Sequence, residues 1–460
     1  MYCGEDVDAI VGDVGSECSK FGLAGEDTPP VVLPSVLGYH LNASDTQQNL
    51  SAYVIGDSIS SPNSNSVWNL HRAIDSCVVK DWDAMEKIWN YAFKNLHVDP
   101  RNHPVLAATL AASSEIGPEG GQAEKMKNSE EYLELMFEKF DVPAFYLAQD
   151  AALDAFAFGR SCALVVEIGA GAARVVPVFD GYALHRPAQL YPSLGMTQIS
   201  KYLEQVISTT HPDLKIRPRY CFQNVLDPKT GRLQAVPKSE EVSKNVPETY
   251  ADYMKLELLR DIRETVCSVF PISNALERIQ KHEHVLQKQE YELPDGTRLI
   301  LGKECHLAPE LFFSPSNQFP VHNDYETVEI KKEDTDLEEA SIQTPCSTHA
   351  KSPQSLQAMV YDAVQKCDAD LRREMLNSII LCGGGSLLPG LMERLHTELS
   401  GMISSSFKIR FLNMMKVERR FSTFIGGSIL ASLGSFQQLW VSSSEYQEMG
   451  ASAICAKRFS

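Results

Sequence analysis

Two short glycine-containing turns are the segments of this 460-residue chain best suited to hold a phosphate group. Gly15-Ser16 follows Asp13 closely, and Gly169-Ala170-Gly171 follows Glu167. Glycine permits positive φ and lets the backbone come close to a ligand, and backbone N–H groups gathered at a tight turn form a concave anion site. The two turns therefore indicate phosphate binding.

Each turn lies between two segments with the composition of β-strands. Ala9-Ile10-Val11 precedes the first turn and Phe21-Gly22-Leu23-Ala24 follows it, while residues 163–166 and 173–178 flank the second turn. The pattern of strand, glycine turn and strand thus occurs twice, which suggests a duplicated fold with a phosphate between its halves. Two glycine turns occur in many α/β proteins, so this pattern alone leaves the family open.

The segments around these turns alternate between regular and irregular structure. Asp81 to Leu96 is predicted as a helix, because apolar residues recur at helical spacing and Asp81 can cap its start. Residues 40–66 are predicted as a polar, variable excursion, and residues 113–129 as a loop. Residues 314–353 combine prolines with an acidic run, which is typical of a disordered insertion. Further helices are predicted over 132–140, 356–372, 387–399 and 424–440, and a buried strand over 378–381.

Composition and charge exclude several classes of protein. The formal net charge of −18 argues against binding bare DNA or an anionic lipid surface over a broad face, and it favours basic partners. No apolar run is long enough to cross a bilayer, and the N-terminus lacks the features of a secretory signal. Eleven cysteines without a C-x-x-C pair indicate reduced thiols. We therefore expect a chain of the nucleus or cytosol without direct membrane contact.

Several longer segments resemble the actin superfamily. The first glycine turn, Lys20 and Phe21-Gly22-Leu23-Ala24-Gly25-Glu26-Asp27 resemble the first phosphate loop of actin. Tyr291-Glu292-Leu293-Pro294-Asp295-Gly296, residues 425–433 and Phe436-Gln437-Gln438-Leu439-Trp440 are nearly identical to actin segments that occur in the same order. The resemblance is highly specific and covers nearly the whole chain outside 41–66, 113–129 and 314–353.

The resemblance implies an α/β, actin-like two-lobed ATPase fold, in which two ribonuclease H-like domains hold a nucleotide in the cleft between them. Residues 1–160 and 422–460 would form the first lobe, with a variable insertion at 40–66 and a loop at 113–129. Residues 161–421 would form the second lobe, with a smaller outer subdomain at about 194–320 and a disordered acidic insertion at 314–353.

Within the superfamily, the segment Tyr2-Cys3-Gly4-Glu5-Asp6-Val7-Asp8-Ala9-Ile10-Val11 resembles the opening of the nuclear actin-related protein 4 class. That class implies a non-filamentous subunit of histone acetyltransferase and ATP-dependent chromatin-remodelling complexes in the nucleus, with the cytoplasm as a second location. The implied partners are nuclear actin and an amphipathic helical segment of a remodelling ATPase or scaffold subunit. Histones are a further candidate, through charge complementarity.

The resemblance also carries a set of nucleotide-binding positions over to this chain, with ATP or ADP and Mg²⁺ as the implied structural cofactor. Asp13 matches the carboxylate that reaches the water shell of Mg²⁺, and Lys20 matches the lysine that meets the β- and γ-phosphates. The full implied set is Asp13, Gly15, Ser16, Lys20, Gly169, Gly171, Arg263, Glu264, Gly384, Leu388 and Arg420. The alternative is that these residues now only hold the two lobes together.

The positions that orient the attacking water in hydrolytic members of the superfamily are altered. Asp150, Ala170 and Arg174 stand where those members have a glutamine, an aspartate and a histidine, and Glu167 replaces the first aspartate of the second loop. Glu17 replaces a glycine and adds a negative charge beside the phosphates. Because attack on the γ-phosphate needs a positioned water, we expect nucleotide binding with little or no hydrolysis, no enzymatic role and no catalytic residue.

A second implied site is the groove between the lobes, which accepts an amphipathic helix in actin-like proteins. Its lining in this chain would be Phe156, Phe158, Ile425, Ile429, Leu430 and Leu433. The alternative for any one of these residues is an ordinary core position.

Two other functions share this fold class. A conventional actin-like ATPase would polymerise in the cytoskeleton, although residues 40–66 do not resemble actin's docking loop. A sugar kinase or chaperone of the same superfold is disfavoured, because the actin-like segments continue to the C-terminus and no additional substrate domain is visible. Phosphate release together with filament sedimentation would identify the conventional ATPase.

Overall fold

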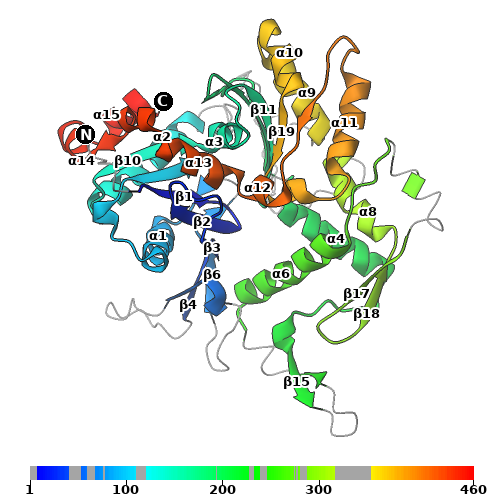
Figure 1. Cartoon of the computed structure of the whole chain (residues 1–460). Helices are drawn as coiled ribbons and strands as arrows, with labels where there is room; N and C mark the ends of the chain where they lie inside the picture. Colours follow the sequence, from blue (N-terminus) through cyan, green and yellow to red (C-terminus); the bar gives the residue numbers. More distant parts are fainter. Residues whose placement is uncertain are drawn as a thin grey trace, which may run out of the picture.

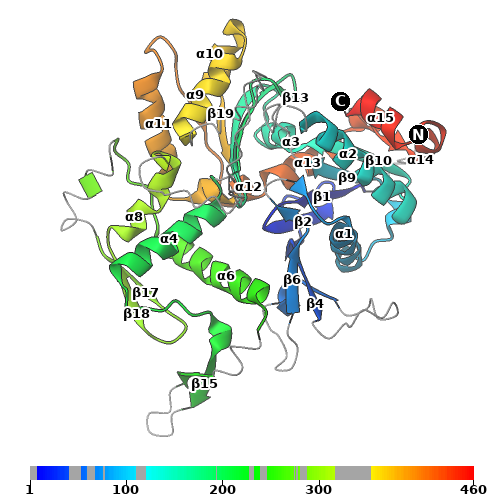
Figure 2. The same cartoon turned by 180° about the vertical axis from the view of Figure 1, so that it is seen from behind.

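Two mixed six-stranded sheets form the centres of two lobes, which Figures 1 and 2 show from opposite sides. The computed structural model describes residues 8–40, 53–59, 68–75, 78–109, 121–192, 194–226, 233–238, 246–273, 275, 278–279, 287–315 and 354–459. The predicted α/β, actin-like two-lobed fold is confirmed. Within the described part of the chain, no helix combines the length and apolarity that a membrane span requires.

The first sheet joins an antiparallel hairpin to parallel strands. Its order is β21 (Val441–Ser442), β10 (Ala144–Gln149), β9 (Val105–Thr109), β1 (Ile10–Val14), β2 (Cys18–Leu23) and β3 (Val31–Pro34). β1, β9 and β10 run parallel, whereas β2 and β3 are antiparallel to their neighbours. The parallel strands read as continuous apolar runs, since both faces of the sheet are covered.

The second sheet repeats this arrangement. Its order is β13 (Tyr182–Ala183), β12 (Ala173–Phe179), β11 (Ala163–Ile168), β19 (Ile379–Cys382) and β20 (Phe411–Leu412), and β14 (Gln189–Tyr191) also pairs with β12. β11 and β12 form an antiparallel hairpin, while β11, β19 and β20 run parallel. Each lobe therefore begins with a glycine-turn hairpin whose first strand continues into a parallel sheet, as the repeated sequence pattern predicts.

Helices cover both sheets, and two of them lie between the lobes. α1 (Trp82–Leu96), α2 (Gly121–Glu134) and α15 (Ala451–Arg458) pack on one face of the first sheet. α4 (Met196–Thr210), α6 (Glu248–Val266), α9 (Leu356–Lys366), α10 (Ala369–Asn377) and α11 (Leu391–Met402) contribute to the core on one face of the second sheet. α3 (Asp150–Ala157) contributes to the inner cores of both lobes, and α13 (Ser422–Ser432) packs against α3. These two helices therefore link the lobes.

The helix predicted at Asp81–Leu96 is confirmed. Asp81 is the N-cap, and its side chain accepts a hydrogen bond from Ala84 N at 2.9 Å. Such a cap satisfies one of the N–H groups that have no partner inside the helix. His97 ends the helix in the left-handed conformation with φ 56°.

Four expectations about local structure are wrong in part. The loop expected at 113–129 is helical from Gly121 onward, because good helix formers such as Gln, Ala, Glu and Lys dominate that segment. The excursion at 40–66 contains a strand, β5 (Tyr53–Ile55), which pairs with β4 (Val36–His40). The helix expected at 356–372 is two helices separated at Cys367 and Asp368. The helix expected at 424–440 ends at Ser432, and Leu433 is extended.

The outer part of the second lobe contains a hairpin that was not predicted. β15 (Phe222–Leu226) pairs in antiparallel register with β16 (Leu233–Pro237) and projects from the lobe in Figure 1. A second hairpin, β17 (Gln289–Glu292) and β18 (Arg298–Leu301), lies beside α6. The N-terminal segment before Asp8, most of 40–66 and nearly all of the acidic insertion at 314–353 lie outside the described residues.

Candidate functional site

The first glycine turn brings a carboxylate and an ammonium group together. Asp13 on β1 is the register partner of Lys20 on β2, and Lys20 Nζ lies 2.6 Å from Asp13 Oδ2. Gly15 N donates to Cys18 O at 3.3 Å and closes the turn. Burial disfavours the charged ammonium, but the charge and hydrogen bond of Asp13, together with the nearby Cys18 and Asp154, raise the pKa of Lys20 overall. The lysine therefore remains a fixed cation at the turn.

The second glycine turn has the same form and carries the start of helix α4. Gly169 N donates to Ala172 O at 2.9 Å. Met196 N and Thr197 N, in the first turn of α4, donate to Gly169 O and Ala170 O at 3.0 Å each. A Cβ atom on Gly195 would lie 2.2 Å from Ala170 O, so only glycine permits this close approach.

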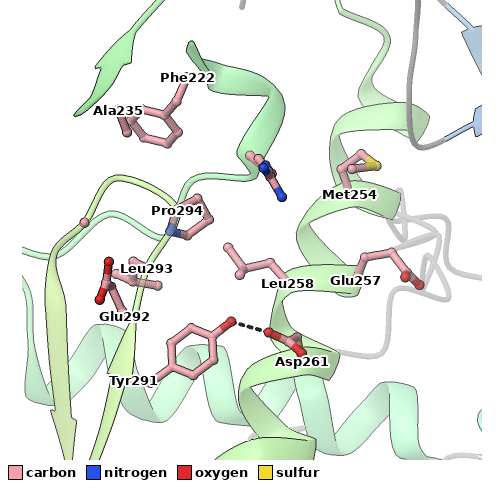
Figure 3. Close-up of a pocket in the computed structure, with 12 residues that line it drawn as sticks. Phe222, Ala235, Met254, Glu257, Leu258, Asp261, Tyr291, Glu292, Leu293 and Pro294 are labelled. Carbon is pink, nitrogen blue, oxygen red and sulfur yellow. Dashed lines mark hydrogen bonds between the residues drawn. The ribbon is translucent and has the colours of Figure 1, made fainter. Parts of the chain in front are cut away.

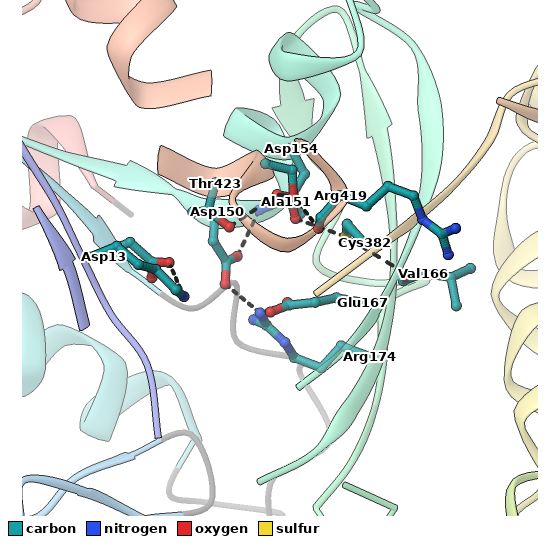
Figure 4. A network of polar contacts seen from close by, with 12 residues as sticks. Asp13, Asp150, Ala151, Asp154, Val166, Glu167, Arg174, Cys382, Arg419 and Thr423 are labelled. Atoms are coloured by element: carbon teal, nitrogen blue, oxygen red, sulfur yellow. Dashed lines mark hydrogen bonds and ion pairs between the residues drawn. The ribbon is translucent and has the colours of Figure 1, made fainter. Parts of the chain in front are cut away.

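Arg174 forms an ion pair with each of two carboxylates at the second turn. Its guanidinium group donates to Glu167, its register partner on the neighbouring strand, and to Asp150 at the start of α3. The side chains of Arg174 and Asp150 are only 4% and 5% exposed. Figure 4 shows Glu167 and Asp150 converging on Arg174, with Asp13 across from them. Three of the positions that differ from a hydrolytic site, Asp150, Glu167 and Arg174, are thus held together by charge.

One turn of α3 after Asp150, a second carboxylate is completely buried. Asp154 accepts hydrogen bonds from Ser422 Oγ at 2.6 Å and Thr423 Oγ1 at 3.0 Å, and Cys382 Sγ donates to it at 3.1 Å. Burial raises the pKa of Asp154 to about 6, although these hydrogen bonds oppose the shift. Asp154 therefore connects α3, α13 and β19 at the junction of the lobes. Asp154 was not among the predicted site residues, although an aspartate one turn after Asp150 within an alanine-rich helix is a signal that the sequence contains.

An ion pair connects the two lobes directly at the first turn. Glu17 Oε1 accepts a hydrogen bond from Arg260 Nη1 at 3.2 Å, and Arg260 on α6 also pairs with Glu257 at 2.5 Å. Burial lowers the pKa of Arg260, but Glu257 and Glu17 raise it by more. Arg72, on β6 (Trp68–Arg72), donates to Ser16 O at 3.3 Å. These residues line a narrow cavity between the turn and α6, together with Thr197, Ser200, Tyr253, Leu256 and Arg263.

The other predicted nucleotide residues occupy different environments. Arg263 is buried and donates to Met196 O at 2.8 Å and to Ser200 Oγ at 2.7 Å. Leu388 packs in the core of the second lobe, whereas Gly384 faces open space. Glu264 is 61% exposed, and Arg420 is an exposed residue that stacks over the ring of Phe421.

Three observations fit these residues to a bound nucleotide. Each turn is closed by a backbone hydrogen bond from its first glycine, and this tight form, repeated in both lobes, is of the kind that gathers N–H groups around an anion. Arg263 Nε, which belongs to a residue lining the narrow cavity, is buried and has no hydrogen-bond partner among the described residues. Within the described ranges, no cluster of three His, Cys, Asp or Glu side chains is arranged to hold a metal ion by itself. Any magnesium ion would therefore be bound together with phosphates and water.

Comparison with known proteins decides the family. The family model described as Actin matches residues 4–460. This chain belongs to the actin family. It is 34% identical to proteins named Actin-related protein 4 from Oryza sativa subsp. indica and from Arabidopsis thaliana, with alignments that cover 99% of this chain and 100% of each relative. The Yarrowia lipolytica protein of the same name is 31% identical, over 100% of this chain and 97% of the relative. The predicted resemblance to the actin-related protein 4 class is confirmed.

In this actin-family chain, the predicted partner groove has a mixed lining. Ile429 and Leu433 are 42% and 43% exposed at the end of α13. Ile425 and Leu430 are half-buried and pack against the inner core of the first lobe. Phe156 and Phe158 are half-buried at the end of α3, and Phe158 packs against the inner core of the second lobe. Two of the six residues are thus exposed, and the other four are half-buried.

Proposed function

We propose that this actin-family chain is a non-filamentous nuclear subunit of histone acetyltransferase and chromatin-remodelling complexes, which binds ATP or ADP with Mg²⁺ and turns over little or none of it. The proposal that ATP is not turned over rests on the buried ion pairing of Arg174 with Asp150 and Glu167. A guanidinium group held by two carboxylates has no lone pair with which to accept a proton from water. Residues that would aim a water at the γ-phosphate are replaced by groups that neutralise one another.

In the proposed complex, the protein binds the nucleotide but does not act on it. Backbone N–H groups of Ser16 and Gly171 would hold the phosphates, Gly15 and Gly169 would close the two turns, and Lys20 would supply a point charge. Asp13 would face the water shell of Mg²⁺, and Arg263 would lie on the ribose side. When bound, the magnesium nucleotide supplies only charge and bulk between the lobes. The lobes are then held in one arrangement, which preserves the groove beside α13.

Nucleotide analysis of the purified protein, followed by single-turnover kinetics, tests this proposal. We expect stoichiometric ATP or ADP after denaturation, no phosphate release above the rate of buffer alone, and no sedimenting filaments. Phosphate release at an actin-like rate together with filaments would instead support the conventional polymerising ATPase. Protein that remains free of nucleotide in saturating MgATP would contradict the proposed cofactor.

Partner binding is tested at the exposed end of α13. Leu433→Asp should weaken binding of an amphipathic helical segment of a remodelling ATPase or scaffold subunit, because it would leave a charge in an apolar contact. We expect about tenfold or greater loss in a pull-down titration, as is common when a central interface anchor is lost. Met449→Asp is the control, since Met449 is similarly exposed at 36% but lies on α14 (Ser443–Met449). Unchanged recovery with Leu433→Asp would contradict the groove.

The cellular role is tested by purification from nuclei. We expect co-elution with actin and with subunits of chromatin complexes. Because the net charge is −18, basic histone segments are additional candidates for weak, salt-sensitive contact. Recovery with cytoskeletal filaments and without chromatin proteins would contradict the nuclear assignment.

A further inference from the structure

A pocket of about 610 Å³ opens in the outer part of the second lobe, on another face of α6 from the narrow cavity. Figure 3 shows α6 on one side, the turn after β17 on the other, and the β15–β16 hairpin at the top. The volume lies within the range of ordinary ligand pockets. The lining residues are Arg219, Phe222, Ala235, Met254, Glu257, Leu258, Asp261, Tyr291, Glu292, Leu293, Pro294 and Gly296.

The charge of this pocket favours a cation. Glu257, Asp261 and Glu292 line it against the single guanidinium of Arg219. Glu257 is already paired with Arg260, so Asp261 and Glu292 supply the negative charge available to a ligand. Tyr291 Oη donates to Asp261 Oδ2 at 2.5 Å, which fixes that carboxylate in place. The walls between the charges are apolar, and they would suit the aliphatic stem of a lysine or arginine side chain.

The hairpin that bounds the pocket is an incomplete sheet. Within the described chain, β15 pairs with β16 and with no other strand, and β16 likewise pairs with β15 alone. A two-stranded ribbon is marginally stable in water, and its outer edges present unpaired N–H and C=O groups to another chain. Leu226 is 61% exposed and shares a face of β15 with Phe222, which lines the pocket. Phe222 and Leu226 thus place apolar residues at the two ends of this face, with Asn224 between them along β15.

We propose that the pocket and the hairpin together bind an extended basic segment of a partner protein. The segment pairs as an additional strand along an outer edge of the hairpin, and one of its lysine or arginine side chains enters the carboxylate-lined pocket. Main-chain hydrogen bonds to the ribbon supply affinity, and the pocket supplies selectivity for a cation. An alternating apolar and basic sequence satisfies both requirements, because alternate side chains of a strand point to opposite faces.

A labelled peptide of about six residues that alternates valine with lysine is the probe for this site. Fluorescence anisotropy with the full chain should show that it binds, while a valine–glutamate peptide does not. Hydrogen exchange at the backbone amides of 222–226 and 233–237 should slow when the lysine peptide is bound, since an added strand pairs those edges.

Two charge-reversal variants distinguish binding in the pocket from the general attraction of a basic peptide to an acidic protein. Glu292→Lys should weaken binding by about fivefold, the most that an exposed ion pair usually contributes. Glu448→Lys changes the net charge equally at an exposed position on α14 and should leave binding within experimental error. Leu226→Ser should also weaken binding without a change in charge.

Three outcomes would overturn the proposal. Equal weakening by Glu292→Lys and Glu448→Lys would mean that overall charge, rather than the pocket, attracts the peptide. Equal binding of the two peptides would mean that no cation is selected. Competition by N-acetyl-lysine amide alone, without slowed exchange in the hairpin, would mean that the pocket takes a small cation and no strand is added.

Discussion

At Arg174, one guanidinium group is shared by two carboxylates that belong to different elements, Asp150 on α3 and Glu167 on β11. Removal of one partner from a buried ion pair costs more than the pair contributes, because the remaining charge is left without compensation. The stability of the junction between β11, β12 and α3 therefore depends on Arg174.

Arg174→Ala should lower the free energy of unfolding by about 3 to 5 kcal/mol, since two carboxylates would remain beside each other without their cation. Arg298→Ala is the control, because Arg298 pairs with Glu290 at 3.0 Å but is 71% exposed. Exposed pairs of this kind contribute about 1 kcal/mol or less. Urea unfolding followed by circular dichroism measures both variants. Similar small losses would show that the pairing of Arg174 does not stabilise the fold.

Asp154 gives the stability a pH dependence of unusual sign. Burial raises its pKa to about 6 in the folded chain, above the ordinary value of an unfolded aspartate near 4. Between these values the folded state holds a proton that the unfolded state has lost. A rise in pH through this window therefore favours unfolding.

Asp154→Asn should remove this contribution. The contribution falls as the pH rises in the original protein and is absent from the variant, so the free energy of unfolding of the variant, minus that of the original, should increase from pH 4 to pH 7. The slope should reach at most about 1.4 kcal/mol per pH unit in this window. Urea titrations at several pH values measure the difference, in which the contributions of the other carboxylates cancel. A difference that stays flat would mean that the pKa of Asp154 is the same in the folded and the unfolded chain.

At the scale of elements, the contact between α13 and α3 depends on the absence of a side chain. A Cβ atom on Gly426 would lie 1.8 Å from Leu153 O, a backbone atom that cannot move aside without shifting α3. The sequence of α13 therefore determines how closely the helix approaches α3 at the junction of the lobes.

Gly426→Ala should destabilise the protein by roughly 1 to 3 kcal/mol or more, the usual range for an overpacked core. Gly434→Ala is the matched control, because no atom lies within 4 Å of its added Cβ and its φ is not positive. That variant should differ from the original by less than about 0.5 kcal/mol. Differential scanning calorimetry compares the two, and equal melting temperatures would contradict the tight contact.

The elements that sequence reasoning located correctly are those with local signals. The two glycine hairpins and the capped helix α1 each depend on residues within a short span. The cross-strand pairing of Asp13 with Lys20 is equally local but was not predicted. Glu167 and Arg174 lie at equal distances along the chain from the centre of the second turn, as Asp13 and Lys20 do from the centre of the first. The pairing of Glu167 with Arg174 could therefore have been predicted from the sequence. The β15–β16 hairpin lacked alternating apolar residues, and α2 lacked a clear apolar stripe. The ion pairs of Arg174 with Asp150 and of Glu17 with Arg260 join distant segments, and only the fold brings these together.

At the scale of the whole molecule, Glu17 and Arg260 connect the two lobes where a nucleotide would enter. The pair is 3.2 Å long and both side chains are 36% exposed, so it can open without a large loss of stability. In the proposed nucleotide-bound state, the pair would hold the lobes closed over the phosphates.

Glu17→Gln should therefore accelerate release of a fluorescent ATP analogue by up to about fivefold, consistent with the loss of one exposed ion pair. Glu290→Gln is the control, because it also removes an exposed ion pair, with Arg298 at 3.0 Å, but lies on β17 outside the predicted nucleotide site. Stopped-flow displacement by unlabelled ATP measures both rates. Unchanged release from Glu17→Gln would contradict a closing role, whereas failure of all forms to bind the analogue would contradict the nucleotide site itself.

The order of the two lobes along the chain affects how the protein folds during its synthesis. β21 and α15 complete the first lobe, and Val441, Ile454 and Cys455 are buried in its core. On the ribosome, the strands of the first lobe emerge long before these residues do, and the entire second lobe is translated in between. The second lobe can therefore close first, while apolar surface of the earlier lobe stays uncovered until translation ends. We therefore expect the N-terminal third of the nascent chain to need chaperone protection more than the rest of the chain.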